Sequence, residues 1–376
     1  MDENQEKMMH VNITAGLLAS VATMALAVLP VTASAQDLNA LVAGAKAEGQ
    51  LTVIGVSHDW CGYGALIQGF KDKYGLVVNE LNPNAGSGEE LATIKANIGN
   101  TGPQAPDVID VGMVFGPTAM QEELLQPYKV KTWDSIPDAV KDPEGHWYGD
   151  YYGVLAFLVN KDVAKKSPTD WSDLRDPMYK KSISVPADPR TANNAILSIY
   201  AAGLATGAKS GADAARAGIE FYRQLNEIGN LVPTFGTAAA IAKGETPITT
   251  RWDFNGIIYN ENFHGNPPIE TIVPKVTVAG VYAQAISKYA PHPNAAKLWM
   301  EYLYSDEGQI GFLQGLCHPI RFDQMRKAGS ITDEMVTKLP PSGDNVVFPS
   351  LQDLIEVGKI VAENWTTSIN ANAWKN

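Results

Sequence analysis

The chain has 376 residues, of which 45% are hydrophobic and 19% are charged, and its formal net charge at pH 7 is −12. This length is sufficient for two globular lobes, each with its own core. The acidic balance argues against a nucleic-acid partner, because phosphate groups require a basic protein surface.

Residues 1–35 have the pattern of a secretory signal peptide. An apolar run from Ile13 to Val31 is followed by Ala33-Ser34-Ala35, small residues that are typical of a cleavage site. Polar residues and a proline interrupt the run, so it is poorly suited to be a permanent membrane span. We expect cleavage after Ala35 and a mature chain that lies outside the cytoplasm. Acidic residues near the N-terminus are unusual in a signal, so the start codon stays open among three methionines: Met1, Met8 and Met9.

In the first third of the mature chain, short apolar segments alternate with segments in which apolar residues recur at helical spacing. Residues 51–56, 76–81 and 107–111 predict buried strands, separated by helices near 66–74 and 91–98. This alternation predicts a parallel α/β sheet. Further strands are predicted at 152–159, 183–187, 246–251, 269–273 and 279–286, and further helices at 191–204, 212–228, 294–305, 307–314 and 351–363.

The order of these elements predicts two α/β lobes between which the chain crosses more than once, near 148–154 and 274–281. Residues 36–153 and about 279–320 would form lobe 1, and residues 154–278 would form lobe 2. Residues 321–376 would form C-terminal helices that pack on one or both lobes.

The sequence contains none of the common catalytic motifs for nucleophilic, phosphate-binding or zinc-dependent chemistry. The histidines are scattered without a close pair, so we expect no metal and no cofactor. The acidic pairs Glu89-Glu90 and Glu122-Glu123 are interpreted as solvated helix faces. A secreted α/β enzyme stays open as an alternative class, although no motif argues for it.

Ligands of open parallel sheets bind beyond the carboxyl ends of the strands, so the turns that follow strands hold the candidate site residues. Asp59 and Trp60 follow the first strand, and Phe115 follows the third. Arg190 and Thr191 follow the strand at 183–187. Thr191 would cap a helix whose free N–H groups face an anion, and Arg190 would add a bidentate donor.

A further candidate group is Arg251, Trp252 and Asp253. In an extended segment, Arg251 and Asp253 would share one face, which would suit a ligand with both an anion and a cation. Trp252 could cover an alkyl stem or a cation. The structural alternative is an Arg251–Asp253 salt bridge beside core aromatic residues. Tyr282, after the second crossing, is a candidate on the same reasoning.

Cys61 and Cys317 are the two cysteines of the chain. In an oxidising compartment they could form one disulfide, and otherwise they would be two unpaired thiols.

Several segments resemble the extracellular solute-binding proteins of ABC importers, in the group that includes ferric-iron, spermidine/putrescine, thiamine and aminoethylphosphonate binders. The resemblance extends over most of the mature chain. The segments that carry it are residues 106–110 with 123–127, 152–162, 171–181, 244–248, and 290–297 with 305–309.

The resemblance implies a periplasmic binding protein fold of type II, in which two α/β lobes close about a hinge over one small solute. It also implies a permease partner in the inner membrane, a monomer and no enzymatic activity. No tyrosine pair occurs at residues 251–254, where iron binders have one, so iron is disfavoured. The mixed charges of Arg251 and Asp253 favour a zwitterion such as γ-aminobutyrate, with a polyamine or an aminophosphonate as alternatives.

Overall fold

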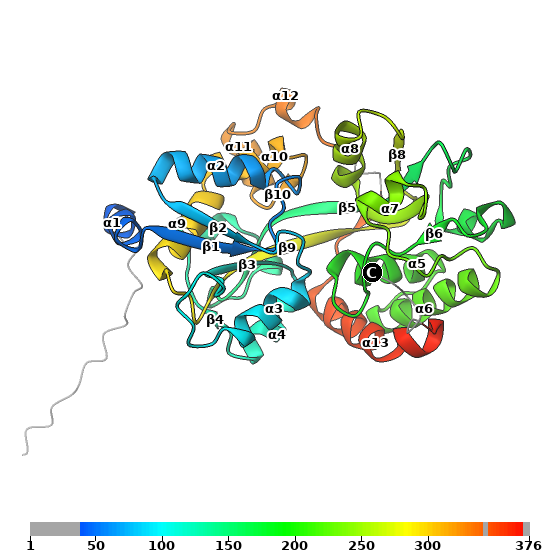
Figure 1. Ribbon diagram of the computed structural model, residues 1–376, viewed down its shortest axis with the longest axis horizontal. Coiled ribbons are helices and arrows are strands. Elements are labelled where there is room, and N and C mark those ends of the chain that lie inside the picture. Colours follow the sequence, from blue (N-terminus) through cyan, green and yellow to red (C-terminus); the bar gives the residue numbers. More distant parts are fainter. Residues whose placement is uncertain (1–37, 341–344, 371–376) are drawn as a thin grey trace, which may run out of the picture. The chain divides into compact units, whose positions relative to one another are not determined.

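The first strands form a parallel sheet (Figure 1). In the computed structural model, which describes residues 38–340 and 345–370, β1 (Gln50–Ile54) lies between β2 (Val77–Leu81) and β3 (Val108–Gly112) and pairs in parallel with both. β3 is buried along its whole length, as expected for a strand with helices on both faces of its sheet. The predicted signal peptide, residues 1–35, lies outside the described residues.

Helices cover both faces of this first sheet. α2 packs with α9 and α10, whereas α3 and α4 contact β3. Gly75 ends α2 with φ of 70°, a left-handed conformation that glycine adopts without steric cost. The helices of this half are α1 (Leu38–Glu48), α2 (Tyr63–Tyr74), α3 (Ser87–Ala96), α4 (Phe115–Gln121), α9 (Pro293–Leu303) and α10 (Asp306–Gln314).

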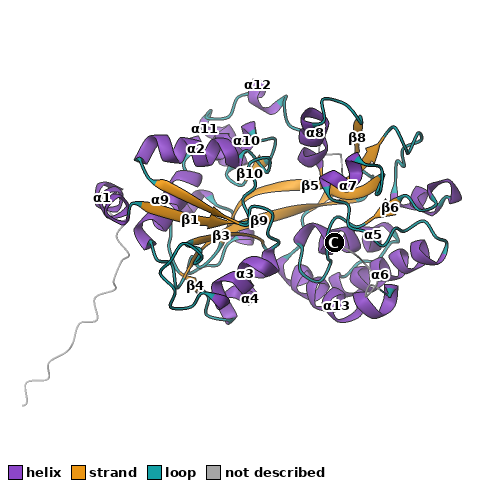
Figure 2. Ribbon diagram, in the orientation of Figure 1, coloured by secondary structure: helices purple, strands orange, loops and turns teal. Residues whose placement is uncertain are grey.

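Two long strands, β5 (Tyr148–Asn160) and β9 (Thr277–Ser287), extend through the described structure from one set of elements to the other (Figure 2). β9 is antiparallel to β3, and β5 is antiparallel to β9 as far as Val154. From Leu155 onward, β5 pairs instead with β7 (Ile248–Trp252). A single strand thus belongs to both sheets, and its change of partner marks the boundary between them.

The second sheet consists of β7, the far end of β5, β6 (Ile183–Ser184) and β8 (Ile269–Ile272). α5 contacts β7 and α6, and α8 contacts β5, β7 and β8. The helices of this half are α5 (Asn193–Ala205), α6 (Gly211–Glu227), α7 (Ala238–Ala242) and α8 (Asp253–Asn262).

The C-terminal elements pack on both halves. β10 (His318–Pro319) pairs with β5, and β11 (Val346–Val347) pairs with the start of β9. α13 (Leu351–Ile369) packs on α6. The remaining short elements are α11 (Phe322–Ala328), α12 (Asp333–Val336), β4 (Leu125–Gln126), and the 3-10 helices η1 (Trp133–Ser135), η2 (Asp138–Val140), η3 (Trp171–Arg175) and η4 (Pro177–Tyr179). Within the described ranges, none of the helices has the length and apolar character needed to span a bilayer.

Two local predictions are wrong. The segment from Arg251 to Phe254 is not extended throughout, because β7 ends at Trp252 and α8 begins at Asp253. The alternation of charged and aromatic residues imitates a strand, but the Asp253 carboxylate accepts the Phe254 N–H and stabilises the first helical turn. Thr191 does not cap α5, which begins at Asn193 with no side-chain cap.

Candidate functional site

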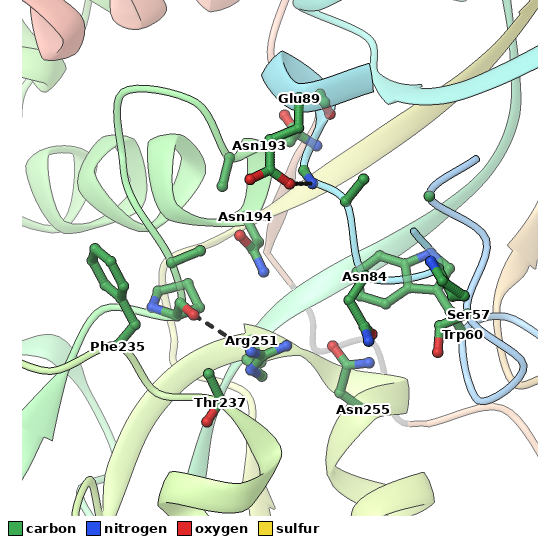
Figure 3. A pocket seen from close by; sticks show the side chains of 18 of the residues that line it. Ser57, Trp60, Asn84, Glu89, Asn193, Asn194, Phe235, Thr237, Arg251 and Asn255 are labelled. Atoms are coloured by element: carbon green, nitrogen blue, oxygen red, sulfur yellow. Dashed lines mark hydrogen bonds between the residues drawn. The ribbon is translucent and has the colours of Figure 1, made fainter. Parts of the chain in front are cut away.

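A cavity of about 660 Å³ lies where the turns after several strands meet (Figure 3). The turns after β1 and β2 contribute Ser57, Trp60 and Asn84 from the first half. The second half contributes the turn after β6, the loop before α7, and the junction of β7 and α8. The carboxyl ends of the parallel strands thus position the cavity, as this class of sheet predicts.

Arg251 is the cationic side chain of the cavity. Its Nε donates to the Gly236 carbonyl oxygen at 2.9 Å, and its Nη2 lies 3.4 Å from that of Pro186. The guanidinium also lies over the ring of Tyr259, 5.7 Å from the centroid. Among the cavity-lining residues that the structure describes, Arg251 alone carries a positive charge, and it forms no ion pair with a described carboxylate. The protein therefore orients a positive charge at the cavity without neutralising it.

The other charged side chains of the cavity wall are acidic. Asp188 is neutralised by Arg190, with an N–O distance of 2.5 Å. The remaining four have no cationic partner on the wall: Asp59, Glu89, Glu90 and Asp110. A ligand that neutralised both kinds of charge would need an anionic and a cationic group.

Glu90 and Asp110 are buried, with exposed fractions of 1% and 3%. The Asp110 backbone N–H donates to Glu90 Oε2 at 2.9 Å. Burial raises the pKa of both carboxyls, and the negative charge of Asp110 raises the pKa of Glu90 further. The interpretation of the Glu89-Glu90 pair as a solvated face is right for Glu89, which is exposed, and wrong for Glu90.

Backbone and side-chain groups of the second half complete the cavity wall. Asn193 and Asn194 form the first turn of α5, whose N-terminus has no side-chain cap, so free N–H groups are available to an anion there. The Oδ1 atom of Asn255 on α8 is buried and has no hydrogen-bond partner. These groups extend the polar surface next to Arg251.

The cavity brings together five of the predicted site residues: Asp59, Trp60, Thr191, Arg251 and Tyr282. Trp60 packs edge-on against Tyr282, with 5.5 Å between ring centroids, and its Nε1 donates to the Tyr151 hydroxyl at 2.6 Å. Thr191 contributes as an exposed lining residue of the turn rather than as a helix cap.

Four predicted site residues lie outside the cavity lining. Phe115 is half-buried against the core at the start of α4, and Arg190 is occupied by Asp188. Trp252 is buried and donates weakly to the Tyr282 hydroxyl at 3.3 Å. Asp253 is buried, and its Oδ1 accepts from the backbone of Val154 and Phe254. Trp252 and Asp253 therefore have structural roles at the junction of β7 and α8.

Cys61 and Cys317 form a disulfide, which resolves the alternative that the sequence left open. The bond joins the turn after Trp60 to the segment before β10. No cluster of three or more potential metal ligands occurs among the residues that the structure describes. A second, shallower pocket of about 350 Å³ lies beside the disulfide and shares Asp59 with the main cavity.

Sequence reasoning missed the site roles of several polar residues. Asp110 carries a signal that could have been used, because it is an acid in an otherwise apolar strand, whereas Glu90 follows Glu89 at an ordinary helix start. The others follow ordinary loop or helix-start patterns and had no such signal: Asn193, Asn194, Thr237 and Asn255.

Comparison with known proteins adds to this geometry. A family model described as bacterial extracellular solute-binding protein matches residues 104–315, which is more than half of the chain. The chain belongs to this family. The prediction from the sequence, an extracellular solute-binding protein, is therefore confirmed.

Solved structures show the same fold for this solute-binding protein. The periplasmic binding protein P5PA has 24% identity and a TM-score of 0.62, covering 85% of this chain and 99% of its own. AfuA from Actinobacillus pleuropneumoniae, with fructose-6-phosphate bound, has 22% identity and a TM-score of 0.65, covering 86% and 99%. The Atu4243-GABA receptor has 15% identity and a TM-score of 0.61, covering 85% and 97%. The predicted two-lobed periplasmic binding protein fold of type II is confirmed.

Proposed function

We propose that this solute-binding protein captures a small zwitterion, such as γ-aminobutyrate, in the periplasm and delivers it to an ABC permease in the inner membrane. Family membership supports the solute-binding role. The disulfide between Cys61 and Cys317 supports a location outside the cytoplasm, because such bonds persist in oxidising compartments.

The observation that carries the proposal is the unpaired charge of Arg251. Its two hydrogen-bond acceptors are neutral carbonyl oxygens, which orient the guanidinium but do not neutralise it. A planar guanidinium matches the geometry of a carboxylate or a phosphonate. The uncapped start of α5 adds a favourable field for the same negative group.

The acidic groups of the opposite wall would hold the cationic end of the ligand. Asp59 lies in the turn after β1, Glu90 lies in the first turn of α3, and Asp110 lies at the middle of β3. Trp60 lies beside them and can add a cation–π contact. A zwitterion satisfies both walls at once, whereas a polyamine has no anion for Arg251 and a sugar phosphate has no cation for the acids.

The path of the chain explains how such a ligand would act. β5 belongs to both sheets, so a bend in this strand where it changes partners would move one half relative to the other. A ligand that contacts both walls selects the arrangement in which they are close. No covalent step is needed, and we propose that the protein acts as a monomer without a cofactor.

Thermal denaturation of the purified protein with single solutes tests the proposal. γ-Aminobutyrate or 2-aminoethylphosphonate should raise the melting temperature, and a concentration of 100 times Kd corresponds to about 2.7 kcal/mol of stabilisation. Putrescine, fructose-6-phosphate and ferric citrate should have much smaller effects. A shift with putrescine or the sugar phosphate alone would overturn the zwitterion assignment, and turnover of any solute would overturn the binding role.

Arg251→Gln is the decisive variant for the site. It should cost about 2–5 kcal/mol of binding free energy, because it removes the one positive charge that the described residues place on the wall. Arg216→Gln is the matched control, since Arg216 is exposed on α6 and lies 3.7 Å from Asp213. Equal affinities of both variants would remove Arg251 from the site.

A further inference from the structure

Three buried carboxyl groups lie together under one wall of the cavity. Glu90 on α3, Asp110 on β3 and Asp150 on β5 are each no more than 3% exposed. Glu90 and Asp110 line the cavity, whereas Asp150 lies outside the lining and interacts electrostatically with Asp110. Their negative charges oppose one another, and no described Lys or Arg pairs with any of them. Burial without a counter-ion favours the protonated form of a carboxyl group.

The groups that face these carboxyls are neutral donors. The Tyr151 hydroxyl donates to Asp110 Oδ2 at 2.7 Å, and the Tyr63 hydroxyl donates to Asp150 Oδ2 at 3.2 Å. Gln284 on β9 donates to the Tyr63 hydroxyl at 2.7 Å. Titratable side chains also face the three carboxyls from each element that packs against them. They are Tyr63 on α2, Glu89 on α3, Tyr151 on β5, Tyr282 on β9 and Tyr304 after α9. None of them supplies a positive charge.

Asp110 is connected to the cavity in two ways. Its Oδ1 atom is buried without a hydrogen-bond partner, although the residue forms part of the cavity wall. Its Oδ2 atom is bonded to Tyr151, whose hydroxyl accepts from Trp60 Nε1 at 2.6 Å. Trp60 itself lines the cavity. A charge placed in the cavity would therefore act on Asp110 both directly and through this chain of hydrogen bonds.

We propose that the Asp110–Glu90 pair is the counter-ion for the ammonium group of the solute, and that capture of the solute expels a proton from the pair to the solvent. This inference rests on the proposed function, because it requires an amine-bearing ligand. The ligand arrives already protonated, the pair loses one proton, and no covalent bond changes. The pair would thereby determine specificity, since a neutral hydroxyl group at the same place would leave its proton bound.

Isothermal titration calorimetry with γ-aminobutyrate measures this proton directly. The observed binding enthalpies in phosphate and in Tris buffer should differ by the difference between the two buffers' protonation enthalpies, multiplied by the number of released protons, about one. As the pH rises toward neutrality, the affinity should increase by up to about tenfold per pH unit, because the proton is released more easily at higher pH. At higher pH the affinity should level off. The same enthalpy in both buffers at every pH would overturn the inference while leaving the zwitterion assignment standing.

Asp110→Asn and Glu90→Gln should each reduce the released proton toward zero and weaken binding at least about tenfold. Asp253→Asn is the matched control, because Asp253 is also a buried acid but lies outside the cavity lining; its proton release should equal that of the wild type. If Asp110→Asn does not fold, Glu90→Gln and the wild-type buffer dependence decide the question. If no amine-bearing solute binds at all, both this inference and the proposed function are wrong.

Discussion

Asp253, the first residue of α8, accepts a hydrogen bond from the backbone N–H of Val154 at 3.0 Å. Val154 is the last residue of β5 that pairs with β9, and the next residue pairs with β7. A buried side chain of the second half therefore holds the strand at the point where it changes sheets. The predicted ligand contact of Asp253 is replaced by a structural contact at the boundary between the halves.

Asp253→Asn should change how stability depends on pH. Burial raises the pKa of Asp253 to about 7, so the folded protein retains this proton at pH values where the unfolded chain releases it. The wild type should therefore lose unfolding free energy as pH rises from about 4 to about 7, by up to about 1.4 kcal/mol per unit. In urea denaturation, the unfolding free energy of the Asn variant should lack this loss between about pH 4 and about pH 7. The affinity of the variant for solute should be unchanged. Parallel pH profiles of the two proteins would contradict the assignment.

His318 should make the protein acid-sensitive in the opposite sense. Its ring stacks on Tyr152, with 4.7 Å between centroids, and burial lowers its pKa to about 4. Since the unfolded chain takes up this proton near pH 6.5, unfolding free energy should fall as pH drops from about 6.5 to about 4. His318→Phe keeps an aromatic stack without the titration. Its acid-unfolding midpoint should lie at lower pH, whereas equal midpoints would contradict the prediction.

Removal of the disulfide should cost substantial stability. Cys61 and Cys317 are 256 residues apart in sequence, and closure of such a long loop restricts the unfolded chain strongly. A reductant should lower the unfolding free energy by about 4–5 kcal/mol. The double variant Cys61→Ser, Cys317→Ser should match the reduced wild type and should not respond to reductant. A reduced wild type as stable as the oxidised protein would contradict this prediction.

Gly112→Ala should weaken both folding and solute binding. A Cβ at the end of β3 would lie 2.2 Å from Cγ of Asn193, which lines the cavity at the start of α5. Overpacking of this kind costs about 1–3 kcal/mol and would displace the Asn193 amide. Gly358→Ala on α13 is the control, since its Cβ would meet Val114 at 3.4 Å, and it should be neutral or stabilising by up to about 1 kcal/mol. Equal affinities of both variants would exclude a role for Asn193.

The strands of the first sheet could be predicted because each is a short apolar run followed by a helix with apolar spacing. Residues 51–56 and 107–111 contain most of β1 and most of β3. These signals are local, since a strand that is buried on both faces has to be apolar throughout. The apolar run Tyr152–Val159 predicted most of β5 for the same reason. The start of β5 at Tyr148 was not predicted, because the residues before Tyr152 show no regular apolar pattern.

The cavity was predictable only where a strand leads directly into it. Arg251 and Trp60 were predicted because they lie at or just after strand ends, but the burial of Glu90 depends on a contact between α3 and β3 that no local pattern reports. The polar character of Asp253 suggested a ligand contact. Its partner, Val154, is distant in sequence, so the hydrogen bond that explains Asp253 could not be inferred from neighbouring residues.

The passage of β5 from the first sheet to the second also bears on how this protein can be altered. The first half is not an unbroken stretch of the gene, because β9, α9 and α10 follow the second sheet in sequence. A cut at the first crossing would also divide β5 at its middle. A new solute preference is therefore more accessible by substitutions in the turns around the cavity than by grafting a whole module from a relative.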